Sequence, residues 1–170
     1  MAKTVMIFGL GAVGEVALQI LARSDGIDRI VTSGRNEALG VFKTNAAALG
    51  ATYQRLSKRF EFRQNDLKDT DATARLLEEI KPDVILLLAS LKSPAVLGTI
   101  PIQAEVRANL YAAGFGVQLP WHLLLPFKFM QAFEKSGIDA HVVNGSFPDV
   151  TGPALWNHLG FGPTIGMGNI

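Results

Sequence analysis

The amino-acid sequence predicts an α/β fold: a doubly wound parallel sheet of about six strands with helices on both faces. Short apolar runs alternate with helical patterns along most of the 170 residues. This alternation is typical of parallel strands joined by right-handed crossovers. Hydrophobic residues make up 48% of the chain and charged residues 18%, which fits central strands that are buried on both faces. The first apolar run leads directly into a Gly-x-Gly-x-x-Gly motif.

The glycine motif follows the apolar run 5–8. Its first glycine lets the chain leave a strand in a tight turn, and its second lets the backbone approach phosphate oxygens. The third lets the next helix pack closely on the strand. Unpaired N–H groups at the start of that helix attract anions. We therefore expect a Rossmann fold that binds a dinucleotide pyrophosphate, with an ordinary strand–turn–helix junction as the alternative. The expected pyrophosphate-binding residues are Gly9, Gly11, Ala12, Val13 and Gly14.

The other elements follow in the same alternating order. Asn36 is the expected N-cap of the second helix and Gly50 its C-terminal stop, and Asp69 or Thr70 is expected to cap the third. Their arrangement favours the strand order 3-2-1-4-5-6. Further strands are expected at 28–32, 59–63, 84–89, 138–144 and 164–168, and helices at 15–23, 36–49, 70–81, 103–113, 121–136 and 150–159.

The turn after the second strand indicates which dinucleotide is bound. NAD-binding versions of this fold place an Asp or Glu here to bond the ribose 2′-hydroxyl, but residues 32–36 contain no carboxylate. Ser33 and Arg35 can donate to a 2′-phosphate, and a planar guanidinium can do so with two bonds. The sequence thus predicts NADP, with NAD and a merely solvated arginine as the alternatives. Ser33, Gly34, Arg35 and Asn36 are the candidate residues.

Two more strand ends complete the predicted cofactor site. After the third strand, Asp66 is a candidate to accept a bond from the adenine amine, and Leu67 to cover a face of the ring. Asp66 is equally suited to a turn. After the fourth strand, the small residues Ala89 and Ser90 would let the nicotinamide ribose approach the point where the strand order reverses. Lys92 in the same loop is either a functional cation or a solvated charge.

No catalytic group can be named from the sequence. The Tyr-x-x-x-Lys pair of single-domain reductases is absent, because Ser57 follows Tyr53 and Phe115 follows Tyr111 at that spacing. The three histidines do not have metal-ligand spacing, so no metal is expected, and His141 is interpreted as a core residue within a strand. The chain has no cysteine, which excludes disulfides and a thiolate nucleophile.

Charge and hydropathy restrict the partners. The net charge is +1 and there is no basic run, so nucleic acid is not an expected partner. The N-terminus lacks a signal-peptide pattern, and a cytoplasmic location is expected. Residues 108–127 carry no formal charge but are interrupted by glycine and proline. We interpret them as a buried or interface-forming helix pair, through which a homodimer could form, and not as a membrane span.

The chain resembles the N-terminal NAD(P)-binding domain of the saccharopine dehydrogenase-like oxidoreductases. The resemblance covers roughly the first hundred residues and rests on the glycine motif, the Ser33-Gly34-Arg35-Asn36 turn, Asn65-Asp66-Leu67 and residues 81–87. It implies hydride transfer between NAD(P)H and an imine or amino-acid-derived substrate held in a second domain. Extended short-chain dehydrogenases share the other features but usually open with Gly-x-x-Gly-x-x-Gly, and Phe8 stands where that pattern needs its first glycine.

We therefore expect residues 1–170 to form the dinucleotide-binding domain of a longer two-domain oxidoreductase. Two alternatives stay open. One is an atypical or extended short-chain reductase that acts alone. The other is a non-catalytic nucleotide-binding module that serves regulation or dimerisation.

Overall fold

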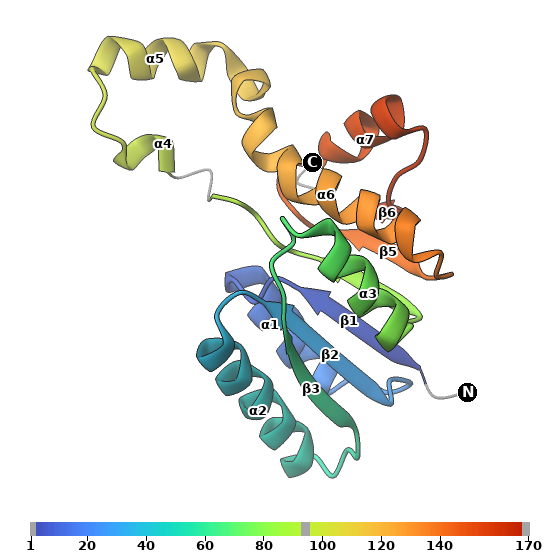
Figure 1. The fold of residues 1–170 in the computed structure, drawn as a ribbon. Helices are drawn as coiled ribbons and strands as arrows, with labels where there is room; N and C mark the ends of the chain where they lie inside the picture. Colours follow the sequence, from blue (N-terminus) through green and yellow to red (C-terminus); the bar gives the residue numbers. More distant parts are fainter. Residues whose placement is uncertain (1–2, 93–95, 168–170) are drawn as a thin grey trace.

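The computed structural model of the chain describes residues 3–92 and 96–167. Within these residues, six strands form one sheet in the order β3-β2-β1-β4-β5-β6 (Figure 1). All neighbouring pairs are parallel, and the order reverses between β1 and β4. The predicted doubly wound topology is confirmed. The strands are β1 (Thr4–Phe8), β2 (Arg29–Gly34), β3 (Arg59–Gln64), β4 (Val84–Leu87), β5 (His141–Asn144) and β6 (Ile165–Gly166).

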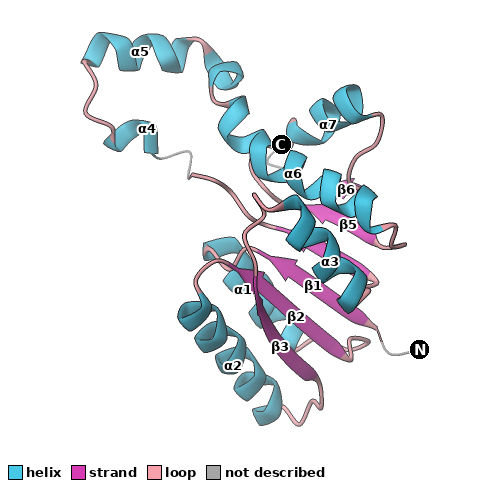
Figure 2. Ribbon diagram, viewed as in Figure 1, coloured by secondary structure: helices cyan, strands magenta, loops and turns pink. Residues whose placement is uncertain are grey.

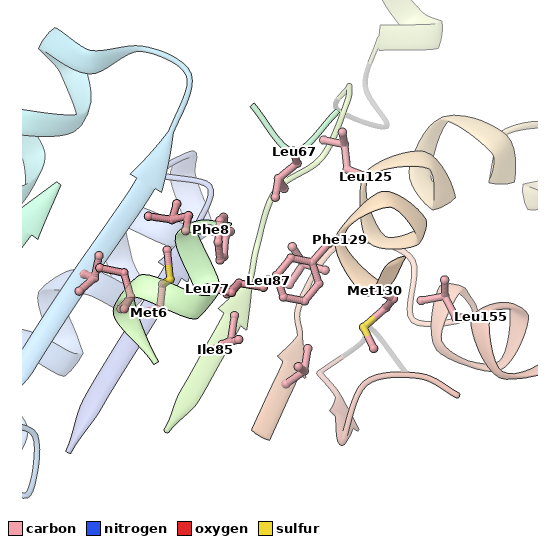
Figure 3. Packing of buried hydrophobic residues seen from close by; sticks show 14 residues of the cluster. Met6, Phe8, Leu67, Leu77, Ile85, Leu87, Leu125, Phe129, Met130 and Leu155 are labelled. Atoms are coloured by element: carbon pink, nitrogen blue, oxygen red, sulfur yellow. The ribbon is translucent and has the colours of Figure 1, made fainter. Parts of the chain in front are cut away.

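Helices cover both faces of the sheet (Figure 2). Helices α1 and α2 pack on one face, around Ile7 and Ile30. Helices α3 and α6 pack on the other, where the rings of Phe8 and Phe129 meet edge to face with centroids 5.3 Å apart (Figure 3). The helices are α1 (Ala12–Ala22), α2 (Glu37–Tyr53), α3 (Thr70–Ile80), α4 (Val96–Thr99), α5 (Ala104–Ala112), the 3-10 helix η1 (Gly114–Val117), α6 (Leu119–Ser136) and α7 (Thr151–Leu159).

The strands beside the reversal end at the same edge of the sheet. Phe8, the last residue of β1, is paired with Ser33 of β2 and with Leu87 of β4. In a parallel sheet the loops after these strands meet at the carboxyl edge, and ligands bind there in open α/β folds. The fold thus brings the predicted site residues to one place.

Two predicted helix starts are confirmed. The side chain of Asn36 accepts a hydrogen bond from the N–H of Leu39 at 3.0 Å and caps α2. Asp69, not Thr70, caps α3, with its carboxylate accepting from the N–H of Ala72 at 2.9 Å. Both side chains satisfy N–H groups that a helix leaves without partners in its first turn.

Two predictions about single residues are wrong. Gly50 does not end α2, which continues to Tyr53. A side chain at position 50 would lie 2.5 Å from the guanidinium of Arg23, the flexible end of a side chain that follows α1. His141 is exposed and not in the core, because it is the first residue of β5 and Val142 is the one that reaches the core.

Some element borders also differ from the predictions. The short helix α4 was not predicted. The last strand, expected over 164–168, is observed at Ile165–Gly166, and position 168 lies outside the described residues. The strand expected over 138–144 begins only at His141.

The segment 108–127 divides between α5, η1 and α6. All residues of α5 are described and none is buried, and the helix stands away from the sheet together with α4 (Figure 1). We call residues 98–121 the arm. Large apolar side chains are exposed along it, with Tyr111 at 52% and Trp121 at 38% exposure. Across the described ranges, no helix combines the length and the apolar character that crossing a membrane requires.

Candidate functional site

A cleft of about 520 Å³ opens at the carboxyl edge of the sheet. Its volume is in the range of ~300–1,000 Å³ that is typical of ligand pockets. Twelve of the thirteen residues predicted to bind a dinucleotide line this cleft. The thirteenth, Gly14, is buried under the loop and does not line the cleft. The twelve are Gly9, Gly11, Ala12, Val13, Ser33, Gly34, Arg35, Asn36, Asp66, Leu67, Ala89 and Ser90.

The three glycines of the motif have different surroundings. Gly9 has a φ of +95°, and a side chain there would lie 2.7 Å from the backbone of Ala89. A side chain on Gly14 would collide with the carbonyl oxygen of Gly9. At Gly11, in contrast, a Cβ atom would meet no described atom within 4 Å. Packing within the protein explains two of the glycines, whereas Gly11 leaves open space at the cleft.

The first turn of α1 lines the cleft through Ala12 and Val13. The first N–H groups of a helix have no partners within the helix, and no side chain in the described part of the protein caps those of α1. These N–H groups and the positive end of the helix dipole favour an anion at this point.

A lysine that the sequence analysis missed contacts this loop from α2. The Nζ of Lys43 donates to the carbonyl oxygen of Leu10 at 2.8 Å. It also pairs with the carboxylate of Glu15 at 2.8 Å, and the lysine side chain is only 14% exposed. The local sequence could not have identified it, because a lysine within a helix is most often a solvated charge.

The loop after β2 presents a cation that has no side-chain partner among the described residues. Arg35 is exposed at the cleft, and its guanidinium forms no hydrogen bond or ion pair with a described residue. Its backbone carbonyl accepts a hydrogen bond from the side chain of Gln64 at 3.0 Å, which anchors the turn. The neighbouring Asn36 already uses its side-chain oxygen to cap α2.

Ser33 lies deeper in the cleft than Arg35. Its side chain is fully buried, and its Oγ has no hydrogen-bond partner among the described residues. A buried hydroxyl without a partner costs roughly 1–3 kcal/mol. The position suits a contact with a ligand at the floor of the cleft more than a contact with an exposed phosphate.

The loop after β3 contributes residues with mixed roles. One carboxylate oxygen of Asp66 accepts from the N–H of Lys68 at 3.0 Å, so this residue does form the turn that was its alternative interpretation. Leu67 belongs mainly to the core, which leaves little of it free to cover an adenine ring. Lys68 also lines the cleft. It is a second cation that the sequence analysis missed, although its place directly after Leu67 could have indicated it.

The other end of the cleft is almost apolar. Its lining includes Ser90, Leu91 and Leu125, and also Gly145 and Phe147 from the loop after β5, which the sequence analysis missed. The described ionisable residues that line the cleft are Arg35, Asp66 and Lys68, and all three follow β2 or β3. This end of the described cleft therefore has no side chain suited to proton transfer.

A buried polar network supports the loop after β5. Asn144 donates from Nδ2 to the hydroxyl of Thr151 at 2.9 Å. Its Oδ1 accepts from the N–H of Ser146 at 3.2 Å and from the hydroxyl of the same serine. These bonds hold the loop that carries Gly145 and Phe147 at the cleft.

His122 of α6 lies next to this loop. It is buried, and its ring meets that of Phe147 edge to face with centroids 5.7 Å apart. Burial lowers the pKa of His122 below its ordinary value, which favours the neutral imidazole. His122 contacts a residue of the cleft wall, but it does not itself line the cleft.

Comparisons with known proteins identify the fold. No family model matches the sequence, and no curated protein matches it. Among solved structures, the chain superposes on malate dehydrogenase from Picrophilus torridus with a TM-score of 0.68 and 19% identity, covering 99% of this chain and 46% of that one. For lactate dehydrogenase from Eimeria maxima with NADH and oxamate the TM-score is 0.63 at 15% identity, covering 98% and 43%.

A saccharopine dehydrogenase is also among the similar structures. The enzyme from Saccharomyces cerevisiae has a TM-score of 0.50 and 20% identity, and the match covers 92% of this chain and 24% of that one. Identities this low show the fold alone. The class defined here is thus a Rossmann-type α/β domain, of a kind found in dehydrogenases, and it spans less than half the length of the solved enzymes that it resembles.

Proposed function

We propose that this chain is the dinucleotide-binding domain of an NAD(P)-dependent oxidoreductase and that it prefers NADP(H). The observation that carries the proposal is the convergence in one cleft of the glycine loop, the start of α1 and Arg35. Within the described residues, no side chain caps this helix start and none pairs with Arg35. The solved enzymes of this fold add support, because lactate dehydrogenase from Eimeria maxima contains NADH and malate dehydrogenase from Archaeoglobus fulgidus is in complex with NADH.

Successive groups of cleft residues fit successive parts of such a cofactor. The loop and first turn of α1 would hold the pyrophosphate, and the turn after β2 the adenosine ribose. Asp66 and Leu67 would lie at the adenine, and Ala89 and Ser90 at the nicotinamide ribose. The bound cofactor would supply a hydride. The orphaned hydroxyl of Ser33 supports this fit, since a ligand atom would give it a partner.

Charge supports NADP over NAD. The loop after β2 holds no carboxylate that would repel a 2′-phosphate, and Arg35 is free to bond one. Lys68 adds a second positive charge to this end of the cleft. The NADH in two of the similar structures is a property of those enzymes, in which the residue after β2 need not be the same.

Proton transfer is proposed to come from outside this chain. The apolar end of the described cleft holds no ionisable side chain, which favours a further domain as the source of the acid or base and of the substrate site. The resemblance to saccharopine dehydrogenase-like enzymes then suggests an imine or amino-acid-derived substrate. Turnover of a substrate by residues 1–170 alone would instead favour a short-chain reductase.

A second candidate function is self-association through the arm. Its exposed Tyr111, Val117 and Trp121 favour this candidate, because apolar surface in one place often marks an interface. Light scattering tests it, and a monomer at high concentration would reject it.

An NMR titration tests the principal proposal. Addition of NADPH to ¹⁵N-labelled protein should shift the amide signals of residues 9–14, 34–36 and 89–90 and leave those of the arm unchanged. Shifts confined to other surfaces, or no shifts, would contradict the assigned site.

A further inference from the structure

The glycine loop is held from outside by Lys43 of α2. Its Nζ bonds the carbonyl oxygen of Leu10 at 2.8 Å, and Leu10 lies between the first two glycines of the motif. The same Nζ pairs with the carboxylate of Glu15 at 2.8 Å. One mostly buried cation thus links the loop before α1 with the first turn of α1.

The charge of Glu15 makes this contact relevant to anion binding. Glu15 is in the first turn of the helix whose N–H groups line the cleft. An acidic side chain there stabilises the helix by itself, but it repels an anionic ligand at the same N-terminus. The ammonium group of Lys43 offsets that negative charge.

We propose that Lys43 is the positioning residue of the glycine loop, which it holds at the Leu10 carbonyl while it neutralises Glu15, so that the loop can accept a pyrophosphate. The inference rests on the proposed function. Lys43 does not line the cleft, so it acts through the two residues that it contacts and not by touching the ligand.

The other end of α1 offers a matched control. Lys58 donates to the backbone carbonyls of Leu21 and Ser24 at the C-terminus of this helix. Like Lys43, it places an ammonium group on main-chain oxygen, but it has no carboxylate partner among the described residues. It is also not at the cleft. Loss of Lys58 should lower stability without changing nucleotide affinity.

The affinities of two variants for NADPH and for 2′-AMP distinguish the role of Lys43 from that of Lys58. Lys43→Met should weaken NADPH binding about tenfold, the loss expected for one charge-assisted hydrogen bond. The same variant should leave 2′-AMP binding unchanged, because 2′-AMP has no pyrophosphate. Lys58→Met should bind both as the wild type does. Wild-type affinity for NADPH in Lys43→Met, or an equal loss in Lys58→Met, would overturn the proposal.

A double variant tests the neutralisation. In the Lys43→Met background, Glu15→Gln should restore part of the lost NADPH affinity, because no unpaired carboxylate then faces the phosphates. Lys43→Arg should retain most of the affinity. If Glu15→Gln restores nothing, the neutralising role is wrong.

Hydrogen exchange without nucleotide gives an independent readout. The N–H of Gly9 donates to the carbonyl oxygen of Ser33 at 3.0 Å, and the N–H of Glu15 donates to the carbonyl oxygen of Gly11 at 2.9 Å. Both should exchange faster in Lys43→Met by a larger factor than amides elsewhere in the sheet, whereas Lys58→Met should show no such local excess. Absence of the local excess in Lys43→Met would overturn the positioning role. Absence of any nucleotide binding by the wild type would refute the proposed function, and exchange would then decide the role of Lys43 alone.

Discussion

The carbonyl oxygen of Gly9 occupies the space that a side chain on Gly14 would need. This contact joins the loop after β1 to the first turn of α1, and it explains the spacing of the first and third glycines. Gly11 has no such neighbour in the described part of the chain. The motif therefore combines two glycines required by packing with one whose open surroundings suit a ligand.

The glycines should respond differently to alanine. Gly14→Ala should lower the free energy of unfolding by about 1–3 kcal/mol, as overpacking does. Gly11→Ala should leave stability within about 0.5 kcal/mol, as at other surface positions, but weaken NADPH binding. Thermal unfolding and nucleotide titration of both variants check this. Equal destabilisation by the two substitutions would contradict it.

Arg35 should control the choice between the two cofactors. Arg35→Ala should weaken NADPH binding about tenfold or more, the scale of one bond to a charged group, and leave NADH binding nearly unchanged. Arg75→Ala, at an exposed position on α3, is the control. If Arg35→Ala keeps the wild-type ratio of the two dissociation constants, the 2′-phosphate assignment is wrong.

Ser33→Ala should have opposite effects on stability and on binding. It removes a buried hydroxyl without a described partner, so the free energy of unfolding should stay the same or rise by up to about 1 kcal/mol. NADPH affinity should fall, because the ligand loses a partner. The paired hydroxyls of Thr44 and Thr32, 2.6 Å apart, provide the control: Thr44→Val should destabilise. Destabilisation by Ser33→Ala would show that the hydroxyl has a partner in the free protein.

His122 should make stability depend on pH. Burial lowers its pKa below the ordinary value of 6.5, so between the two pKa values the unfolded chain binds more protons than the native one. The free energy of unfolding should therefore rise with pH up to about 6.5 and fall on acidification below it. Urea unfolding at several pH values measures this slope. His122→Phe should flatten it, whereas the exposed His141→Gln should not.

Much of the fold could be predicted from the sequence. The apolar runs before Gly9 and after Pro82 identify buried parallel strands, and Asn36 and Asp69 identify helix starts because their side chains act locally. Gly50 misled because α2 continues past it to Tyr53, and a glycine within a helix gives the same local signal as a glycine at its end.

The candidate site was predictable only in part. Residues of the glycine motif and of the β2 turn follow strand ends, and the topology collects strand ends at one edge. Lys43 and Phe147 reach the site from α2 and from the loop after β5. Such residues carry no local signal, since only the tertiary packing brings them to the glycine loop and the cleft wall.

Calorimetric titration of the wild-type chain with NADPH and with NADH tests the central claim most directly. We expect NADPH to bind at one site with a dissociation constant at least about tenfold below that of NADH, a difference of about 1.4 kcal/mol. Equal or tighter NADH binding would contradict the preference for NADP. Absence of binding by both nucleotides would contradict the assignment of this cleft as a dinucleotide site.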